Sequence, residues 1–224
     1  MKEHPILFTS AMVRAILDGR KTQTRRIGKF QKDDATELGV EYIGHATKGL
    51  EAVATYRAFP DEGSARWGLC PCPYGVPGDR LWAKETHYWD RFEKLPTTKP
   101  DDFPMDFYYR ADGECCEQIP ECQCGSEGKT KWRPSIFMPR WASRITLEIT
   151  NVRVERLQDI SESEAMAEGV IVKPSAGIAS NFCGGNPGAA QFEYYALWES
   201  INGKGSWARN PWVWVIEYKR IKPA

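Results

Sequence analysis

The sequence predicts a mixed α+β fold, and three observations lead to this prediction. Stretches of alternating apolar residues, which are typical of strands, recur along the chain and are clearest over 144–157 and 212–218. Capped segments near 10–18 and 191–201 carry apolar residues at helical spacing. The chain has 224 residues, which is enough to bury one substantial core, so we expect one elaborated domain.

The N-terminal half is expected to alternate strands with one helix. A short strand at 6–8 leads to a helix for which Ser10 is the expected N-cap and Gly19 the residue just past the end. Four later segments have the composition of strands, namely 41–43, 51–56, 80–88 and 107–110. The first two, 41–43 and 51–56, are expected to pair as a hairpin.

The C-terminal half carries the clearest signals. Apolar residues of the strand at 144–157 change phase near Asn151, which predicts a β-bulge. The strand at 212–218 is apolar on both faces, so it is expected to be central and buried. Between them, Ser161 and Glu164 form a capping box that predicts a helix over 162–168, ending at Gly169.

A basic stretch lies where the first helix ends and an extended segment begins. It reads Gly19-Arg20-Lys21-Thr22-Gln23-Thr24-Arg25-Arg26. Four cations and two hydroxyls at a helix exit suit a site for an anion or a polar ligand. The candidate binding residues are Arg20, Arg25 and Arg26. A solvated basic turn is the alternative interpretation, since charge runs are common on protein surfaces.

The same region contains a candidate nucleophile and base. Threonine is a poor nucleophile unless a base lies next to it, so Thr24 needs such a neighbour. Lys21 serves as that base only if burial or nearby cations push its ammonium toward neutrality. A leaving amine then needs a proton donor, and Glu168 at the end of the capped helix is the candidate. Taken alone, Glu168 also fits an exposed helix residue.

Four segments resemble the ASCH-domain family, a branch of the PUA-like β-barrels. The first is the basic stretch above, which is similar to the family's Lys-Thr-x-Thr-x-Arg signature. The others follow in the family's order and are Pro77-Gly78-Asp79-Arg80-Leu81-Trp82, the stretch 157–169 and Pro211-Trp212-Val213-Trp214-Val215-Ile216-Glu217-Tyr218. Together they cover roughly half of the chain, and the rest, at about 28–68 and 90–132, is expected to be insertions into a small barrel of about one hundred residues.

The resemblance implies a reaction. In the bacterial N(4)-acetylcytidine amidohydrolases of the family, the signature lysine is the proton acceptor, the second threonine the nucleophile and the helix glutamate the proton donor. These roles fall on Lys21, Thr24 and Glu168, and Arg26 falls on a further signature arginine. The implied chemistry is hydrolysis of an acetyl amide on a nucleoside through an acyl-threonine, which needs no metal or other cofactor. The insertions and the chain length, about twice that of the family enzymes, resemble phage and prophage versions, whose substrate need not be the same.

Composition limits the partners. Thirty basic and thirty acidic residues cancel, so bulk charge predicts no general affinity for nucleic acid or for membranes. The sequence has no run of eighteen apolar residues, and Met1-Lys2-Glu3-His4-Pro5 lacks the apolar core of a signal peptide. We therefore expect a cytoplasmic protein with no membrane partner, whose seven cysteines are reduced.

Six of these cysteines cluster in or beside the expected insertions. Such a cluster suits a structural zinc ion that ties down a polar insertion. The predicted ligands are Cys72, Cys116, Cys122 and Cys124. Zinc knuckles usually separate paired ligands by two residues rather than one, so a set of reduced, unligated thiols is the alternative.

Basic and aromatic residues interleave over 131–144, where Trp132, Arg133 and Trp141 lie. Arginines for phosphate and tryptophans for stacking are what single-stranded RNA requires, and Arg133 is the residue expected to bind substrate. A core-lining loop is the alternative. Three hypotheses follow from the sequence: an amidohydrolase acting on a modified nucleoside, an RNA-binding or RNA-processing module without acyl chemistry, and a phage accessory protein that binds another protein.

Overall fold

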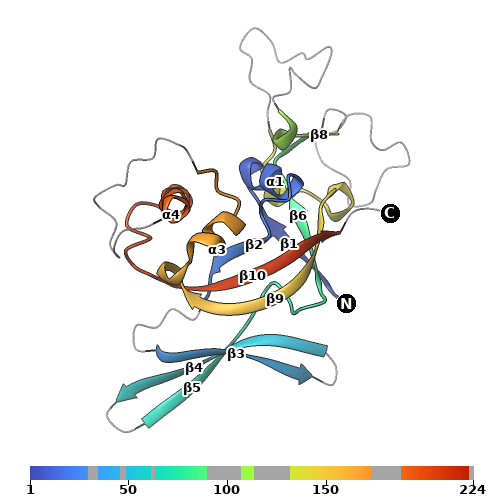
Figure 1. The fold of residues 1–224 in the computed structure, drawn as a ribbon. Helices are drawn as coiled ribbons and strands as arrows, with labels where there is room; N and C mark the ends of the chain where they lie inside the picture. Colours follow the sequence, from blue (N-terminus) through green and yellow to red (C-terminus); the bar gives the residue numbers. More distant parts are fainter. Residues whose placement is uncertain are drawn as a thin grey trace.

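The fold is built on a five-stranded sheet, shown in Figure 1. The computed structural model describes residues 1–29, 35–45, 49–61, 64–89, 107–113, 132–172 and 188–221. The strands lie in the order β1-β6-β9-β10-β2, with β1 and β6 parallel and the other neighbours antiparallel. Their bounds are β1 (Glu3–Leu7), β2 (Gln23–Ile27), β6 (Arg80–Lys84), β9 (Thr146–Arg156) and β10 (Trp212–Ile221).

Helices and smaller sheets surround this sheet, so the mixed α+β prediction is confirmed. The described helices are α1 (Ser10–Leu17), α3 (Glu162–Ala167) and α4 (Ala189–Asn202), and in Figure 1 α3 lies beside α4 while α1 lies on the other side of β2. Short 3-10 turns are η1 (Arg110–Asp112), η2 (Ser135–Phe137), η3 (Arg140–Ala142) and η4 (Leu157–Asp159). A second sheet contains β3 (Ala35–His45), β4 (Gly49–Asp61) and β5 (Ser64–Pro71), and a third contains β7 (His87–Trp89) and β8 (Phe107–Tyr109).

The core is divided by β10, whose two faces are both buried as predicted. Trp214 and Ile216 belong to a cluster that includes Val13 and Ile16 of α1. The intervening Val213 and Val215 belong to a second cluster with Tyr194 and Trp198 of α4. Since successive strand residues point to opposite faces, one strand joins both cores and fixes α1 and α4 relative to it.

Two of three local features predicted from the sequence, the bulge and the capping box, are present in the structure. The bulge is confirmed, because Glu217 pairs with Asn151 whereas Tyr218 pairs with Ile149. The capping box of Ser161 and Glu164 is confirmed as well. The N-cap of α1 is Thr9 and not Ser10, because the Thr9 side chain accepts the hydrogen bond from the backbone of Met12.

Two predicted strand segments are more elaborate than expected. The hairpin at 41–56 is present as β3 and β4, but β5 adds a third strand that pairs with β4. The segment 80–88 is divided between β6 and β7, which belong to different sheets. Among the described residues the main sheet is open, with β1 and β2 at its edges, so a closed barrel is not seen and the PUA-like assignment stays a prediction. Within the described ranges, no helix is long and apolar enough to cross a membrane.

Candidate functional site

The site forms where the exit of α1 meets the end of α3. Lys21 and Glu168 form an antiparallel bridge, although 147 positions separate them in the chain. The backbone N–H of Thr22 donates to the carbonyl of Ala167 at 2.9 Å, and that of Lys21 donates to the carbonyl of Ala15 at 3.0 Å. The helix exit therefore lies against the end of the Ser161 helix.

Gly169 allows this close approach. Its φ of +86° is a conformation that residues with a side chain rarely adopt. A Cβ at this position would lie 2.8 Å from the Cβ of Ala15 and 2.8 Å from the Cβ of Lys21. The predicted helix stop is therefore also the contact point that holds Glu168 next to Lys21.

Lys21 and Glu168 form a buried ion pair. The Lys21 ammonium donates to the Glu168 carboxylate at 2.7 Å and to the Glu168 backbone carbonyl at 2.9 Å. Their side chains are 0% and 2% exposed. Burial lowers the pKa of Lys21, and the nearby guanidinium groups of Arg26 and Arg25 lower it further, against the opposing effect of Glu168. This is the condition under which lysine can serve as a base.

Arg25 adds a second buried cation. Its guanidinium lies 3.5 Å from the other carboxylate oxygen of Glu168, 3.0 Å from Glu155 and 3.3 Å from Glu164. Arg153 in turn binds Glu155, Glu164 and Glu217. Each of the two buried cations, Lys21 and Arg25, is thus paired with at least one carboxylate. Such pairing is needed because burying an unpaired charge costs a large free energy.

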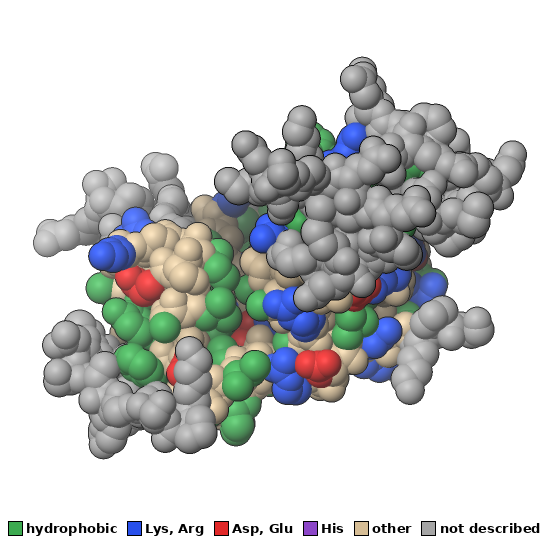
Figure 2. Space-filling model, turned by 90° about the horizontal axis from the view of Figure 1, so that it is seen from above, with side chains coloured by type: hydrophobic (Ala, Val, Ile, Leu, Met, Phe, Trp, Pro, Cys, Tyr) green, Lys and Arg blue, Asp and Glu red, His purple; other side chains and the backbone are tan. Residues whose placement is uncertain are grey.

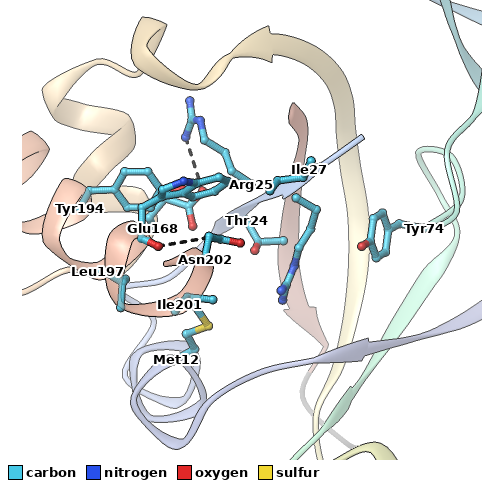
Figure 3. Close-up of a pocket in the computed structure, with 12 residues that line it drawn as sticks. Met12, Thr24, Arg25, Ile27, Tyr74, Glu168, Tyr194, Leu197, Ile201 and Asn202 are labelled. Carbon is cyan, nitrogen blue, oxygen red and sulfur yellow. Dashed lines mark hydrogen bonds and ion pairs between the residues drawn. The ribbon is translucent and has the colours of Figure 1, made fainter. Parts of the chain in front are cut away.

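A cavity of about 140 Å³ opens beside this pair. Thr24, Arg25 and Glu168 line it together with residues of α1 and α4, and Figure 3 shows these side chains converging, with Tyr74 on the far side. The described residues of the lining are Met12, Thr24, Arg25, Arg26, Ile27, Tyr74, Glu168, Tyr194, Leu197, Trp198, Ile201 and Asn202. Lys21 is not in this lining, so Glu168 is the member of the buried pair that faces the cavity.

The cavity lies at the outer edge of β2, where no other described strand pairs with it. Backbone bonds from Tyr218 to Thr22 and from Gly28 to Trp212 set the register between β2 and β10. Because hydrogen-bonding directions alternate along a strand, the peptide groups of Arg25 and Ile27 point away from β10. Both residues line the cavity, so their backbone groups are placed to bind a ligand there.

Residues of α4 were missed as site residues by the sequence analysis. Tyr194 and Asn202 line the cavity, whereas the sequence suggested only an apolar stripe on this helix. Burial raises the pKa of the Tyr194 phenol well above its ordinary value, and the charge of Glu168 acts in the same direction. Tyr194 therefore keeps its proton and can donate a hydrogen bond. The only signal for it was a tyrosine next to the predicted apolar stripe of this helix, but such residues are usually core.

The remaining predicted arginines lie in different places. Arg26 lines the cavity, and its guanidinium donates to the carbonyl of Leu7 and lies 5.5 Å from the ring centre of Phe8. Arg20 is exposed and binds Asp18 and the carbonyl of Gly169, so it is outside the cavity lining. Arg133 lies elsewhere, in a bridge with His87.

The predicted zinc ligands are only partly described. Cys116, Cys122 and Cys124 lie outside the described residues. Cys72 packs against the main core, and burial raises the pKa of its thiol to about 12. A metal ligand is a thiolate, so this environment disfavours Cys72 as a ligand. The described residues contain no group of three or more candidate ligand side chains.

Comparisons with protein-family models, with curated proteins and with solved structures give no match to this chain.

Proposed function

We propose that this chain is an amidohydrolase with a PUA-like, ASCH-type fold that removes the acetyl group from N(4)-acetylcytidine or a related acylated nucleoside. Lys21, Thr24 and Glu168 are the proposed catalytic residues. The observation that carries the proposal is the buried Lys21–Glu168 pair at 2.7 Å, placed behind a cavity that Thr24 and Glu168 line. The resemblance to the family signature supports the choice of substrate.

The pair acts as one proton-transfer unit in this proposal. Burial disfavours charge, so the ion pair and its neutral form, amine beside carboxylic acid, are brought closer in free energy than they are in water. The neutral form contains a base and an acid at once. Glu168 is the member that faces the cavity, so protons enter and leave the pair through its carboxyl group.

The first half of the reaction transfers the acyl group to Thr24. The Thr24 oxygen bonds to the acetyl carbon, and the Lys21–Glu168 pair gains the hydroxyl proton. The C–N bond then breaks, Glu168 gives a proton to the departing amine nitrogen, and the pair returns to its original proton count. The products of this half are the free amino group and an acetyl ester on Thr24.

The second half hydrolyses the ester. Water bonds to the acetyl carbon and loses a proton to the pair, and the ester C–O bond breaks as the Thr24 oxygen takes a proton back. Acetic acid leaves, and all three side chains are restored. In both halves, negative charge develops on the acetyl oxygen, and the candidates that can bind it are the Tyr194 hydroxyl, the free-edge N–H groups of β2 and the Arg25 charge.

The cavity size agrees with an acyl-binding role. A water needs roughly 10–15 Å³, whereas sites that enclose a whole drug-sized ligand have about 300 Å³ or more. A cavity of about 140 Å³ lies between these values. We infer that it holds the acetamide end, while the base rests on the apolar rim formed by Ile27 and Ile201, which are about half exposed.

The test is hydrolysis of N(4)-acetylcytidine by purified protein, with cytidine release followed by chromatography. Thr24→Ala and Glu168→Gln are each expected to lower kcat/KM by at least about a hundredfold, the scale of losing a nucleophile or a general acid. Thr22→Ala is the matched control, because this exposed threonine on the same segment is outside the cavity lining, and it should retain activity.

Two results would refute the proposal. One is a folded wild-type protein that releases no amine from a panel of N-acylated nucleosides. The other is hydrolysis that proceeds equally well in Thr24→Ala and wild type. An acyl-threonine trapped by rapid acid quench and located by mass spectrometry on the peptide containing Thr24 would support it directly.

A further inference from the structure

A second hollow lies apart from the candidate active site. It has a volume of about 560 Å³ and forms where β7 meets the segment that leads into η2. Its lining is Tyr88, Trp89, Trp132, Arg133, Pro134 and Phe137. None of these residues lines the cavity beside Thr24, so the two sites have no lining residue in common among those described.

The aromatic hollow, as we name this site, has a fixed frame. His87 and Arg133 exchange two backbone hydrogen bonds of 3.2 and 2.8 Å, which hold β7 against the segment at 132–134. Behind it, Trp89 packs with Phe107 and Met138 in a small buried cluster. The rings of Tyr88 and Trp132 meet edge to face with centres 6.4 Å apart. The walls are therefore held in place before any ligand binds.

The rim of the hollow exposes apolar surface. The side chains of Phe137 and its neighbour Ile136 are 68% and 59% exposed. Both values are high for large apolar residues of this protein. The backbone carbonyl of Ile136 is held at 2.7 Å by the Lys84 ammonium. An exposed phenylalanine on a braced turn beside an aromatic pocket suits contact with a ligand ring.

Basic groups lie on the same part of the surface. Arg133 belongs to the lining, and Lys84 lies near the rim, where its ammonium binds the carbonyl of Ile136. On the face seen in Figure 2, more of the Lys and Arg side chains lie toward the right, while more of the hydrophobic side chains lie toward the left. Local positive charge thus coexists with a formal net charge of zero.

We propose that the aromatic hollow binds an unpaired base of single-stranded nucleic acid, with Arg133 at an adjacent phosphate. Aromatic faces stack on any base, and a neighbouring cation binds the backbone, which is the combination that single-stranded nucleic acids use. A volume of about 560 Å³ is within the range of roughly 300–1,000 Å³ found for ligand sites, so it accommodates a base with part of its sugar.

This inference does not depend on the proposed hydrolysis, because binding is measured without turnover. Where both hold, the substrates include an acylated base within a strand as well as the free nucleoside. One base then enters the cavity beside Thr24 while another part of the strand stacks in the aromatic hollow. RNA and DNA share the chemistry described here, and the experiment distinguishes them.

The experiment measures binding of fluorescently labelled ten-nucleotide strands of RNA and of DNA by anisotropy, at several salt concentrations. Phe137→Ala is expected to weaken binding roughly five- to a hundredfold, the scale of losing one base–aromatic stack. Arg133→Gln should weaken binding and reduce its salt dependence. Ile171→Ala is the matched control, since Ile171 is 65% exposed but lies outside both cavities, and it should bind like wild type.

The outcomes separate the two proposals. Wild type that binds neither strand at physiological salt, or Phe137→Ala that binds as tightly as wild type, overturns the aromatic hollow as a nucleic-acid site. Duplex RNA that competes as well as single strands overturns it too, because paired bases cannot stack there. Protein that binds strands through Phe137 but hydrolyses no acylated nucleoside refutes the amidohydrolase and leaves the hollow standing.

Discussion

The buried Lys21–Glu168 pair makes a quantitative prediction about stability. Removing one partner of a buried ion pair costs about 3–5 kcal/mol, because the other charge is left without compensation. The two partners are not equivalent here. After Lys21→Met, Glu168 still has the Arg25 guanidinium at 3.5 Å, whereas after Glu168→Gln the Lys21 ammonium keeps the carbonyl oxygen at 2.9 Å but loses its carboxylate. We expect Glu168→Gln near the upper end of that range and Lys21→Met near the lower end.

A double-mutant cycle measures the coupling between the two side chains. The free energy of unfolding is obtained from urea titrations of wild type, Lys21→Met, Glu168→Gln and the double variant at pH 7. The double variant should cost less than the sum of the single variants by about 2 kcal/mol, within the range of roughly 0.5–3 kcal/mol seen for residues in contact. The exposed pair of Arg140 and Glu3 is the control, for which Arg140→Met should cost no more than about 1 kcal/mol.

Additive costs, or single-variant costs below about 1 kcal/mol, would refute the assignment of Lys21 and Glu168 as a buried charged pair.

The pH dependence of the free energy of unfolding gives an independent check. Because the pKa of Lys21 is lowered in the fold from 10.5, the unfolded chain binds more protons between the folded pKa and 10.5. The stability contributed by Lys21 therefore rises with pH across that window, and is lost as pH falls through the folded pKa. This rise should be absent from Lys21→Met.

Three further predictions follow from single positions. Gly169→Ala should lower the free energy of unfolding, measured by urea titration, more than Gly19→Ala does. Both glycines have positive φ, but only a Cβ at position 169 would lie 2.8 Å from the Cβ of Lys21. Equal losses of unfolding free energy would refute the close-contact argument. Ser161→Ala should cost about 1 kcal/mol through loss of the capping box, and a cost near zero would show that the cap is not needed. Cys72, whose thiol pKa burial raises to about 12, should be alkylated at pH 8 only after unfolding, and rapid labelling of the folded protein, mapped by mass spectrometry, would contradict this.

The sequence was sufficient for features that depend on near neighbours. The capping box needs only Ser161 and Glu164, and the bulge near Asn151 was visible as a change of apolar phase. The burial of both faces of β10 followed from the apolar residues at 212–218. Each of these features places its signal within about a dozen residues, where periodicity is a direct consequence of backbone geometry.

Features that depend on distant segments were not predictable in the same way. Nothing local to Lys21 shows that Ala15 and Gly169 close around it, and the resemblance alone placed Glu168 nearby. Tyr194 was not singled out, because an amphipathic helix looks the same whether one of its tyrosines faces hydrocarbon or a cavity. Which of the two it faces is decided by the packing of α4 on β10, which is a tertiary property.

The cost of the charged groups around β2 is itself an argument for function. Well-packed hydrophobic residues in place of a buried ion pair are often neutral or stabilising, so stability alone does not require Lys21 and Glu168 to be charged. The charges are also not isolated, since Arg25 links Glu168 to Glu155 and Glu164. A network of this kind holds the Glu168 carboxyl in one orientation, with one oxygen on Lys21 and the other on Arg25, at the wall of the cavity that Thr24 also lines. A buried and fixed carboxyl group of this kind is needed if Glu168 exchanges a proton with a ligand. The catalytic proposal therefore explains the buried charge, whereas a purely structural role does not.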